Sequence, residues 1–386
     1  MSDPADKALL PAGMSDVLPP YAGFEADARE RLISSFVGYG YERVKPPLIE
    51  FEENLLTGSG VALYDQTFRL MDPVSQRMMG VRSDMTLQVA RIATTRLKNA
   101  PRPLRLGYAG EVLRVKGSQL RPERQFGQVG AELIGTESPT GDKEVILMAV
   151  EALEHLGVED LSVDLGLPTL VPAVCQVLGL DEGVMSRLRL ALDRKDDAGV
   201  SALAGQLGGR AEKILLGMLS ATGQAEDVLG ILDGLDLPAA AQAERTCLSE
   251  VVKGIRAGAP NLTLTADAVE NRGFEYHTGV TFTIFSSAVR GELGRGGRYR
   301  AGNGDEQGEP ATGLTLFMDS VLRALAGPVS PKKIFIPSGT PADAARTLRG
   351  EGWITIEGMN YDASPENEAR RMNCTHLLID GKPREV

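Results

Sequence analysis

The chain has 386 residues, of which 42% are hydrophobic and 24% charged, and its formal net charge is −11. This length allows two or three domains with a substantial core, and the acidic balance argues against an extended surface that binds phosphate backbones. Three widely separated cysteines, an N-terminus without a secretion signal and the lack of a long apolar run predict a cytoplasmic protein that does not contact membranes.

The first 163 residues predict one α+β unit built on an antiparallel sheet. The expected helices combine apolar residues at helical spacing, which in the first helix are Ala28, Leu32, Ile33 and Phe36, with glycine or a polar cap at their ends. The Pro-Pro pair at 46–47 favours an edge strand. In chain order we expect a helix at 24–41, an edge strand at 42–50, strands at 64–72 and 77–84, a helix at 83–97, strands at 105–115 and 124–135, and a helix at 142–157.

The rest of the chain divides by composition. Ala, Leu, Glu and Arg dominate from 165 to 258 and predict a helical insertion, after which strand patterns resume at 262–270, 274–287 and 291–299. Residues 312–325 predict a strand that leads into a helix, and the Pro-rich stretch at 328–331 predicts a linker. We therefore expect a core of 1–164 and 259–328, an insertion of 165–258, and a small β-α-β-α-β module of 331–386.

The stretch "RQFGQVGAELIG" at 124–135 is unusual for a strand. Side chains alternate between the two faces of a strand, so Val129 and Leu133 point toward a core while Gln128, Gly130 and Glu132 point the other way. A buried carboxylate without a partner is costly. We therefore expect a polar partner over Gly130 that satisfies Gln128 and Glu132.

Further polar residues lie at expected strand ends. Carboxylates suit an ammonium group and guanidinium groups suit a carboxylate, so together they suit a zwitterionic amino acid. Ordinary ion pairs on a sheet surface remain an alternative on these residues alone. The three histidines have no metal-like spacing, and no phosphate-loop or dinucleotide motif occurs, so we predict no metal and no cofactor. The polar set comprises Arg82, Asp84, Thr86, Arg114, Gln128, Glu132, Arg272 and Tyr276.

These segments together resemble the catalytic core of histidyl-tRNA synthetase, a class II synthetase fold, in order through most of residues 10–326. The segment at 39–50 resembles the dimer-forming first class II motif, and the segment at 111–135 resembles the second. The matching stretches are "GMSDVLPP" (13–20), "YGYERVKPPLIE" (39–50), "RSDMT" (82–86), "EVLRVKGSQLRPERQFGQVGAELIG" (111–135), "RGFEYHTG" (272–279) and "GGRY" (296–299).

The resemblance implies a pocket for a histidine-like ligand over Gly130. Asp84, Thr86, Gln128 and Glu132 would then surround the bound amino acid. Arg114 and Arg272 would lie near its carboxylate. Tyr276 and His277 belong to the histidine-specific segment, in which His277 stands where the family has one of two paired tyrosines.

Three departures from the synthetase pattern concern ATP. In "GLTLFMDS" (313–320), Phe317 replaces a small glycine that lets a nucleotide approach, and Ser320 replaces an arginine that clamps ATP. Lys116 replaces an acidic residue of the second motif. The C-terminal module is short and lacks a basic stripe. We therefore predict that adenylation and tRNA charging are lost, with no catalytic residues and no tRNA partner.

A synthetase core of this kind is similar to the regulatory subunits of ATP phosphoribosyltransferase, the first enzyme of histidine biosynthesis. That resemblance implies a short catalytic subunit as partner, a hetero-octamer in the cytoplasm, a self-dimer through the first motif, and histidine as the feedback effector. Two alternatives remain open, a diverged but active histidyl-tRNA synthetase and a free-standing amino-acid sensor.

Overall fold

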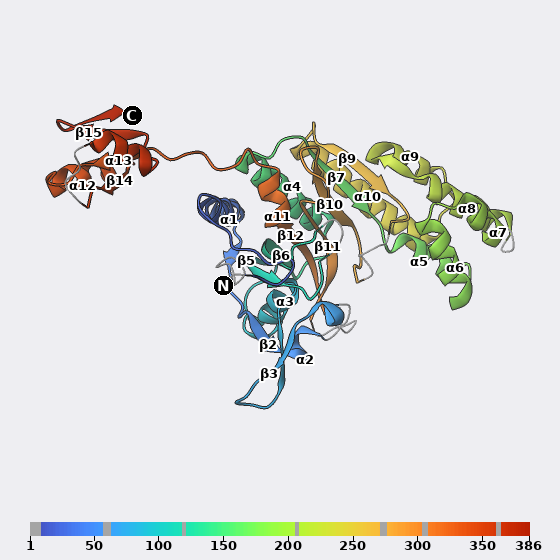
Figure 1. The fold of residues 1–386 in the computed structure, drawn as a ribbon. Coiled ribbons are helices and arrows are strands. Elements are labelled where there is room, and N and C mark those ends of the chain that lie inside the picture. The colour runs from blue at the N-terminus through green and yellow to red at the C-terminus, as the bar shows by residue number, and fades with distance from the viewer. Residues whose placement is uncertain are drawn as a thin grey trace. The chain divides into compact units, whose positions relative to one another are not determined.

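A computed structural model describes residues 9–56, 63–117, 121–204, 208–270, 276–302, 308–359 and 364–386 (Figure 1). The chain forms two compact units, Met1–Ala326 and Gly327–Val386. The first unit holds a nine-stranded sheet and a three-stranded sheet, and the second holds a four-stranded sheet.

The nine-stranded sheet is mostly antiparallel, as expected for a class II synthetase core. Only its β1–β5 and β7–β9 pairs are parallel. The strands expected at 105–115 and 124–135 are both present and pair with each other, with Leu104 opposite Ile134 and Leu113 opposite Gln125. The strands in spatial order are β1 (Glu42–Arg43), β5 (Leu104–Leu113), β6 (Gln125–Ile134), β12 (Glu309–Phe317), β11 (Gly294–Ala301), β10 (Thr281–Ser286), β7 (Leu161–Gly166), β9 (Thr263–Asp267) and β8 (Thr222–Gln224).

One face of this sheet packs against helices α1 (Tyr21–Gly38) and α4 (Pro139–Leu156). The apolar residues of α1 that the sequence placed at helical spacing are all buried there. Ser138 caps α4 by accepting a hydrogen bond from the Thr140 amide at 3.2 Å, and Pro139 occupies its first turn. Gly157 ends α4 with φ 103°, a left-handed conformation that favours glycine.

The opposite face of the sheet carries a second, smaller apolar cluster and packs against α3 (Thr86–Thr95). Val89 and Ala93 of α3 are buried against Leu106 and Ile134 of the sheet. A short helix, α11 (Met318–Arg323), follows β12 directly, as the strand-to-helix pattern predicted. The N-terminal end of α3 thus lies over the face that carries Gln128 and Glu132.

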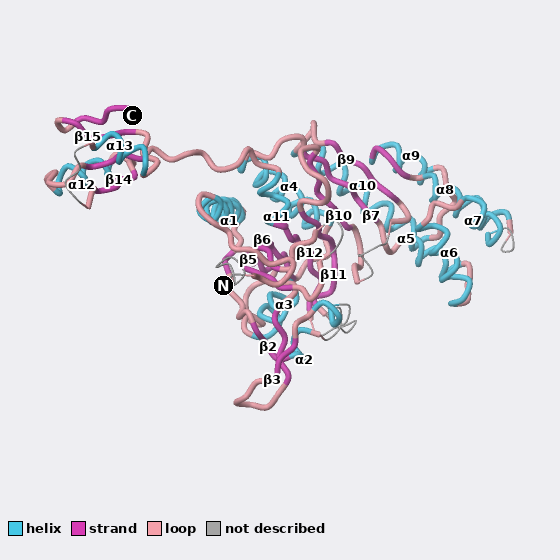
Figure 2. The backbone as a smooth tube through the Cα atoms, in the orientation of Figure 1, coloured by secondary structure: helices cyan, strands magenta, loops and turns pink. Residues whose placement is uncertain are grey.

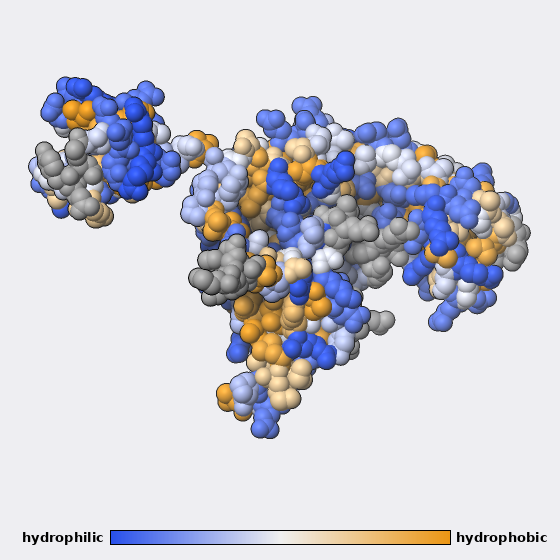
Figure 3. Space-filling view, in the orientation of Figure 1, coloured by the Kyte–Doolittle hydropathy of each residue, from blue (hydrophilic) through white to orange (hydrophobic). Residues whose placement is uncertain are grey.

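A small antiparallel sheet forms from β2 (Ile49–Phe51), β4 (Met78–Val81) and β3 (Arg69–Met71), with β4 in the centre. Helix α2 (Glu52–Leu55) covers one of its faces, where Leu55 lies near Gly80. The other face is apolar and partly exposed. Figure 3 shows apolar residues gathered over the region of β2 and β3.

Between β7 and β9 the chain forms a group of helices (Figure 2). The sequence predicted helices for 165–258 but missed β8, which pairs with β9 and extends the main sheet by one strand. In the described parts of the chain no helix is long and apolar enough to span a membrane. The helices are α5 (Leu170–Val177), α6 (Glu182–Asp193), α7 (Asp197–Ala204), α8 (Gly209–Ser220), α9 (Ala225–Asp233) and α10 (Ala239–Gly258).

The second unit is a small α/β module in which three parallel strands take the order β14-β13-β15. Its helices cover one face each. A fourth strand, β16, was not predicted from the sequence and pairs antiparallel with β15. The elements are β13 (Lys333–Ile336), α12 (Ala342–Gly350), β14 (Ile354–Glu357), α13 (Pro365–Arg371), β15 (His376–Ile379) and β16 (Lys382–Glu385).

Candidate functional site

The strand register aligns a row of polar and glycine residues across the face of the main sheet that packs against α3. Directly opposed residues on neighbouring strands share a face. Glu132 lies opposite Gly313, which lies opposite Gly297, which in turn lies opposite Thr281. The neighbouring row contains Tyr108, Gly130, Thr315 and Arg295.

Glycines in these rows let longer side chains lie flat on the sheet. A Cβ at Gly313 would be 2.2 Å from Oε2 of Glu132, and a Cβ at Gly130 would be 2.3 Å from Cζ of Tyr108. Glu132 therefore leans over Gly313, and the Tyr108 ring lies over Gly130. The space over Gly130, where the sequence placed a ligand, is filled by a side chain of the protein itself.

Gln128 connects the sheet to the loop that precedes α3. Its Nε2 donates to Oδ2 of Asp84 at 2.7 Å, and its Oε1 accepts from the Met85 amide at 3.1 Å. The other oxygen of Asp84 accepts from the Thr86 amide at 2.8 Å. Gln128 is fully buried, so these bonds satisfy an amide that has no access to water.

Glu132 receives a tyrosine hydroxyl at each carboxylate oxygen. Tyr108 donates to Oε1 at 3.1 Å and Tyr299 donates to Oε2 at 2.9 Å. The Tyr108 hydroxyl also lies 3.2 Å from Oγ1 of Thr86 and 3.1 Å from Oγ1 of Thr315. Thr86 thus links the Asp84–Gln128 pair to the Glu132 pair. We call the resulting set, Asp84, Thr86, Tyr108, Gln128, Glu132 and Tyr299, the Glu132 cluster.

Burial controls the charge of this cluster. Glu132 is completely buried, and loss of hydration raises its pKa from the ordinary 4.5 to about 8, although the two tyrosine hydroxyls oppose the rise. The nearby Asp84 charge raises the same pKa further. Burial and the Glu132 charge also raise the pKa values of Tyr108 and Tyr299. A cation placed beside Glu132 would favour its ionised form.

The Arg114 guanidinium lies close enough to the carboxylate of Asp84 to be influenced by its charge. Burial lowers the pKa of Arg114, and Asp84 is the largest opposing influence, while Arg121 and Arg295 add like charge. Arg114 donates to the Ser83 carbonyl at 3.4 Å and lies 5.0 Å from the Phe126 ring centre. Carboxylates on one side and arginines on the other can hold the two charged ends of an amino acid.

Tyr276 and His277 lie beside the Glu132 cluster. The Tyr276 ring is 3.9 Å from the His277 ring and contacts Tyr299 edge-on at 6.4 Å. His277 is 8% exposed, whereas Tyr276 is 45% exposed. Arg272, which was also predicted to bind the ligand, lies outside the described residues.

The three residues that depart from the synthetase pattern have distinct environments. Phe317 is buried, and the Arg121 guanidinium stacks on its ring at 3.7 Å. Arg121 also pairs with Asp319 at 3.2 Å and Glu292 at 3.6 Å. Ser320 is buried and accepts from Arg323 at 3.2 Å, while Lys116 is exposed. The stacked Arg121–Phe317 pair fills space at this end of the sheet face.

Three residues of the site were not predicted from the sequence. Tyr108, Tyr299 and Thr315 join the site through cross-strand register, which the sequence alone does not specify. For Tyr108, the sequence signal is the period-two pattern in 104–113, which places Tyr108 on the same strand face as Leu106. Within the described ranges, no group of three or more His, Cys, Asp or Glu residues could hold a metal ion.

Comparison with known proteins identifies the family to which the chain belongs. The family model described as histidyl-tRNA synthetase matches residues 13–321. A protein of Paramagnetospirillum magneticum named ATP phosphoribosyltransferase regulatory subunit is 56% identical over 378 residues, covering 98% of each chain. The chain belongs to the histidyl-tRNA synthetase-like family of ATP phosphoribosyltransferase regulatory subunits.

Solved structures agree on the fold of this regulatory-subunit family. A Bacillus halodurans structure titled ATP phosphoribosyltransferase regulatory subunit/histidyl-tRNA synthetase is 23% identical, with a TM-score of 0.81 and coverage of 96% of this chain and 97% of that chain. A chain of the ATP phosphoribosyltransferase (HisG:HisZ) complex from Thermotoga maritima is 19% identical, with a TM-score of 0.58 and coverage of 76% and 97%. These likenesses confirm the predicted class II synthetase-like fold. The names of the relatives confirm the prediction of a regulatory rather than a catalytic chain.

Proposed function

We propose that this regulatory subunit binds histidine at the Glu132 cluster and thereby confers feedback inhibition on a short ATP phosphoribosyltransferase catalytic subunit. The reaction of that partner would be the first step of histidine biosynthesis, in the cytoplasm. The observation that carries the proposal is the position of Glu132. It is a fully buried carboxylate that is influenced by the charge of Asp84, and Asp84 in turn influences the Arg114 guanidinium.

The chemistry of the cluster favours a free amino acid. Asp84, Glu132 and the Gln128 amide oxygen offer acceptors to an ammonium or imidazole group, while Arg114 offers a guanidinium to a carboxylate. A buried carboxylate that is surrounded by neutral hydroxyls gains most from a cationic ligand. These features support a set of histidine-binding residues that comprises Asp84, Thr86, Arg114, Gln128, Glu132, Tyr276 and His277. Arg272 is proposed from the resemblance alone.

The environment of Phe317 supports the loss of synthetase chemistry. A nucleotide base or phosphate would need the space that the Phe317 ring and the stacked Arg121 fill. Ser320 offers a phosphate no positive charge, and Lys116 stands where the second motif has an acidic residue. We therefore propose that the chain neither adenylates histidine nor charges tRNA.

The small sheet supports self-association. Ile49, Phe51, Leu70, Met79 and Val81 occupy the same face of β2, β3 and β4 by their register, and α2 covers the opposite face. We call these five residues the apolar sheet face. Because it continues the segment that resembles the first class II motif, we propose that it holds two copies together. The hetero-octamer, four chains of each kind, would then contain two such dimers.

Inhibition by histidine requires that histidine bind one state of the assembly more tightly than another. The complex that contains the Thermotoga maritima neighbour supports a direct partnership between the two subunits. A ligand enclosed by several strands and by α3 can favour one arrangement of those elements over another.

A phosphoribosyl-transfer assay tests the proposal. The catalytic subunit from the same source is mixed with ATP and phosphoribosyl pyrophosphate, with and without this chain, and histidine is then added. We expect this chain to enable or raise the activity and histidine to suppress it. Glu132→Ala should remove the suppression, whereas the control Glu137→Ala, at an exposed ion pair with Arg300, should keep it.

Two other outcomes would replace the proposal. Histidine-dependent ATP–pyrophosphate exchange by this chain alone would indicate an active synthetase. Histidine binding by calorimetry without any effect on the catalytic subunit would indicate a free-standing sensor. Full inhibition of the Glu132→Ala complex would place the inhibitory histidine outside the Glu132 cluster.

A further inference from the structure

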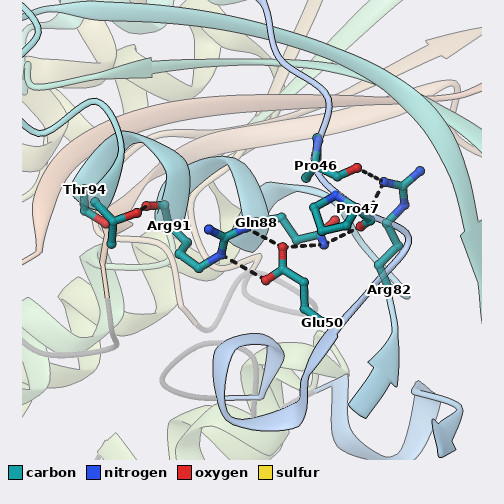
Figure 4. Close-up of polar contacts among 8 residues, drawn as sticks. Pro46, Pro47, Glu50, Arg82, Gln88, Arg91 and Thr94 are labelled. Atoms are coloured by element: carbon teal, nitrogen blue, oxygen red, sulfur yellow. Dashed lines mark hydrogen bonds and ion pairs between the residues drawn. The ribbon is translucent and has the colours of Figure 1, made fainter. Parts of the chain in front are cut away.

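Arg82 connects the loop of the Glu132 cluster to the segment Pro46–Glu50, which precedes and enters β2 (Figure 4). Its Nη1 donates to the carbonyls of Pro46 at 3.0 Å and Pro47 at 3.4 Å, and its Nε donates to the Glu111 carbonyl at 2.7 Å. Its own amide donates to the Leu48 carbonyl at 3.0 Å. Arg82 is 7% exposed, so these bonds are made away from water.

The Arg82 guanidinium also lies beside a sheet neighbour of the Glu132 cluster. A Cβ at Gly110 would be 2.4 Å from Nη2 of Arg82, and Gly110 lies directly opposite Gln128 in the sheet. Two residues after Arg82, Asp84 pairs with the same Gln128. One short stretch of chain therefore contacts the Glu132 cluster with one residue and the Pro46–Glu50 segment with another.

Helix α3 connects the same two regions, because it begins at Thr86 of the Glu132 cluster and its later residues bind the Pro46–Glu50 segment. Gln88 donates to the Pro47 carbonyl at 2.8 Å and to Oε1 of Glu50 at 3.0 Å. Arg91 donates to Oε2 of Glu50 at 2.9 Å and forms a second, short bond with its other oxygen. Figure 4 shows Gln88 and Arg91 of α3 converging on Glu50, with Arg82 beside Pro46 and Pro47.

We infer that Arg82 and Gln88 are positioning residues that transmit occupancy of the Glu132 cluster to the Pro46–Glu50 segment and so to the apolar sheet face. This rests on the proposed binding of histidine. A ligand held by Asp84 and Thr86 restrains the start of α3. Because that start is hydrogen-bonded to Pro46–Glu50 at several backbone and side-chain atoms, the two move as one body. Ile49 of the apolar sheet face lies within this segment, at the start of β2.

Hydrogen exchange with mass spectrometry tests the coupling on the full chain. Histidine should slow amide exchange in peptides that cover 84–90 and 125–134, which we call the pocket peptides. It should also slow exchange in peptides that cover 46–51. The remote effect should be about fivefold or more, the lower end of typical coupling between sites. Arg82→Lys and Gln88→Met should keep the effect on the pocket peptides and lose the effect on 46–51.

Arg102→Lys is the matched control. Arg102 also donates to backbone carbonyls, to that of Ala93 in the last turn of α3 and to that of Leu97 just beyond the helix. These bonds lie at the end of α3 that is remote from Pro46–Glu50. This variant should keep both effects. Circular dichroism shows whether each variant is folded. If Arg82→Lys is not folded, Gln88→Met alone tests the coupling.

Two results would overturn the inference. Slowed exchange confined to the pocket peptides of the wild-type chain would show that occupancy is not transmitted. Slowed exchange at 46–51 that persists in both variants would show a route that uses neither Arg82 nor Gln88. If calorimetry detects no histidine binding at all, the proposed function fails, and the coupling fails with it.

Discussion

The ring of Tyr108 lies directly over Gly130 of the neighbouring strand. A Cβ at Gly130 would be 2.3 Å from Cζ of Tyr108 and 2.4 Å from the carbonyl oxygen of Leu314. The ring can move aside, but the carbonyl belongs to the backbone of β12 and is held by the sheet. Glycine at 130 is therefore a condition for the Tyr108 hydroxyl to reach Glu132.

Gly130→Ala should lower the free energy of unfolding by about 1–3 kcal/mol, the usual cost of an overpacked core. It should also displace Tyr108 from Glu132 and weaken histidine binding. Urea denaturation measures the first effect and isothermal titration calorimetry the second.

The control is Gly230→Ala on the exposed side of α9, where an added Cβ meets no atom within 4 Å. Alanine there should leave stability unchanged or raise it by about 0.5–1 kcal/mol, because glycine weakens a helix interior. A Gly130→Ala chain as stable as the wild type would mean that Tyr108 does not lie over Gly130.

Glu132→Gln should change how stability depends on pH. The folded chain holds the Glu132 pKa at about 8, whereas the ordinary value is 4.5. Between these values the folded state binds a proton that the unfolded state has released, so the stability of the wild type falls as pH rises through this range. The neutral amide removes this contribution. As pH rises from 5 to 8, the free energy of unfolding of the variant should therefore increase relative to that of the wild type, by on the order of a few kcal/mol.

Chemical denaturation at several pH values measures the difference between the two chains. Below about pH 4.5 both states carry a protonated Glu132, so the two chains should show their smallest difference there. Parallel stability curves for Glu132→Gln and the wild type from pH 5 to 8 would contradict the raised pKa. A ligand cation that binds ionised Glu132 should also bind more tightly as pH rises toward 8 and release a proton, which calorimetry in buffers of different ionisation heat detects.

Phe317→Ala should lower the free energy of unfolding by about 3–5 kcal/mol, as for other buried aromatic residues. Phe317 is 2% exposed and contacts both the Phe126 ring and the Arg121 guanidinium. Its removal takes away the ring on which Arg121 stacks at 3.7 Å. Guanidinium chloride denaturation provides the measurement.

Arg323→Ala is the comparison for the same region. Its side chain is 42% exposed, and its ion pairs with Glu123 and Asp319 are long, at 3.5 Å each. It also donates to Ser320 at 3.2 Å. Exposed pairs of this kind contribute about 0–1 kcal/mol. Equal losses from the two substitutions would indicate that Phe317 is not packed as the structure has it.

The local elements of the fold could be predicted because local pattern determines them. The helical spacing of Ala28, Leu32, Ile33 and Phe36 predicted the buried face of α1, and all four are buried. Alternation in 124–135 predicted the two faces of β6, and Val129 and Phe126 do lie in different apolar clusters. Resemblance supplied the class of fold, but the order of the strands in the sheet was not predicted, because no local pattern contains it.

The partners of Glu132 could not be predicted in this way. Tyr299 lies 167 positions from Glu132 in the chain. Its hydroxyl reaches the carboxylate because β11 and β6 are both neighbours of β12 in the sheet. The sequence indicated that Gln128 and Glu132 need polar partners, but it did not distinguish a ligand from tyrosines of the protein. Strand β8 was missed for a similar reason, since its three residues contain a glycine and form a strand only through pairing with β9.

Arg298→Ala should be among the most destabilising single substitutions in the main sheet. Asp142 is completely buried at the start of α4, and it accepts from Arg298 and, at 2.6 Å, from Thr312. Removing the guanidinium leaves this carboxylate buried without its cation, which typically costs about 3–5 kcal/mol. The double variant with Asp142→Ala should cost less than the sum of the two single variants, because the unpaired charge is then absent. Thermal and urea denaturation of the four chains complete the cycle, with Arg346→Ala at a solvent-exposed pair expected to change little. Additive losses in this cycle would mean that Arg298 stabilises the sheet through packing and not through Asp142.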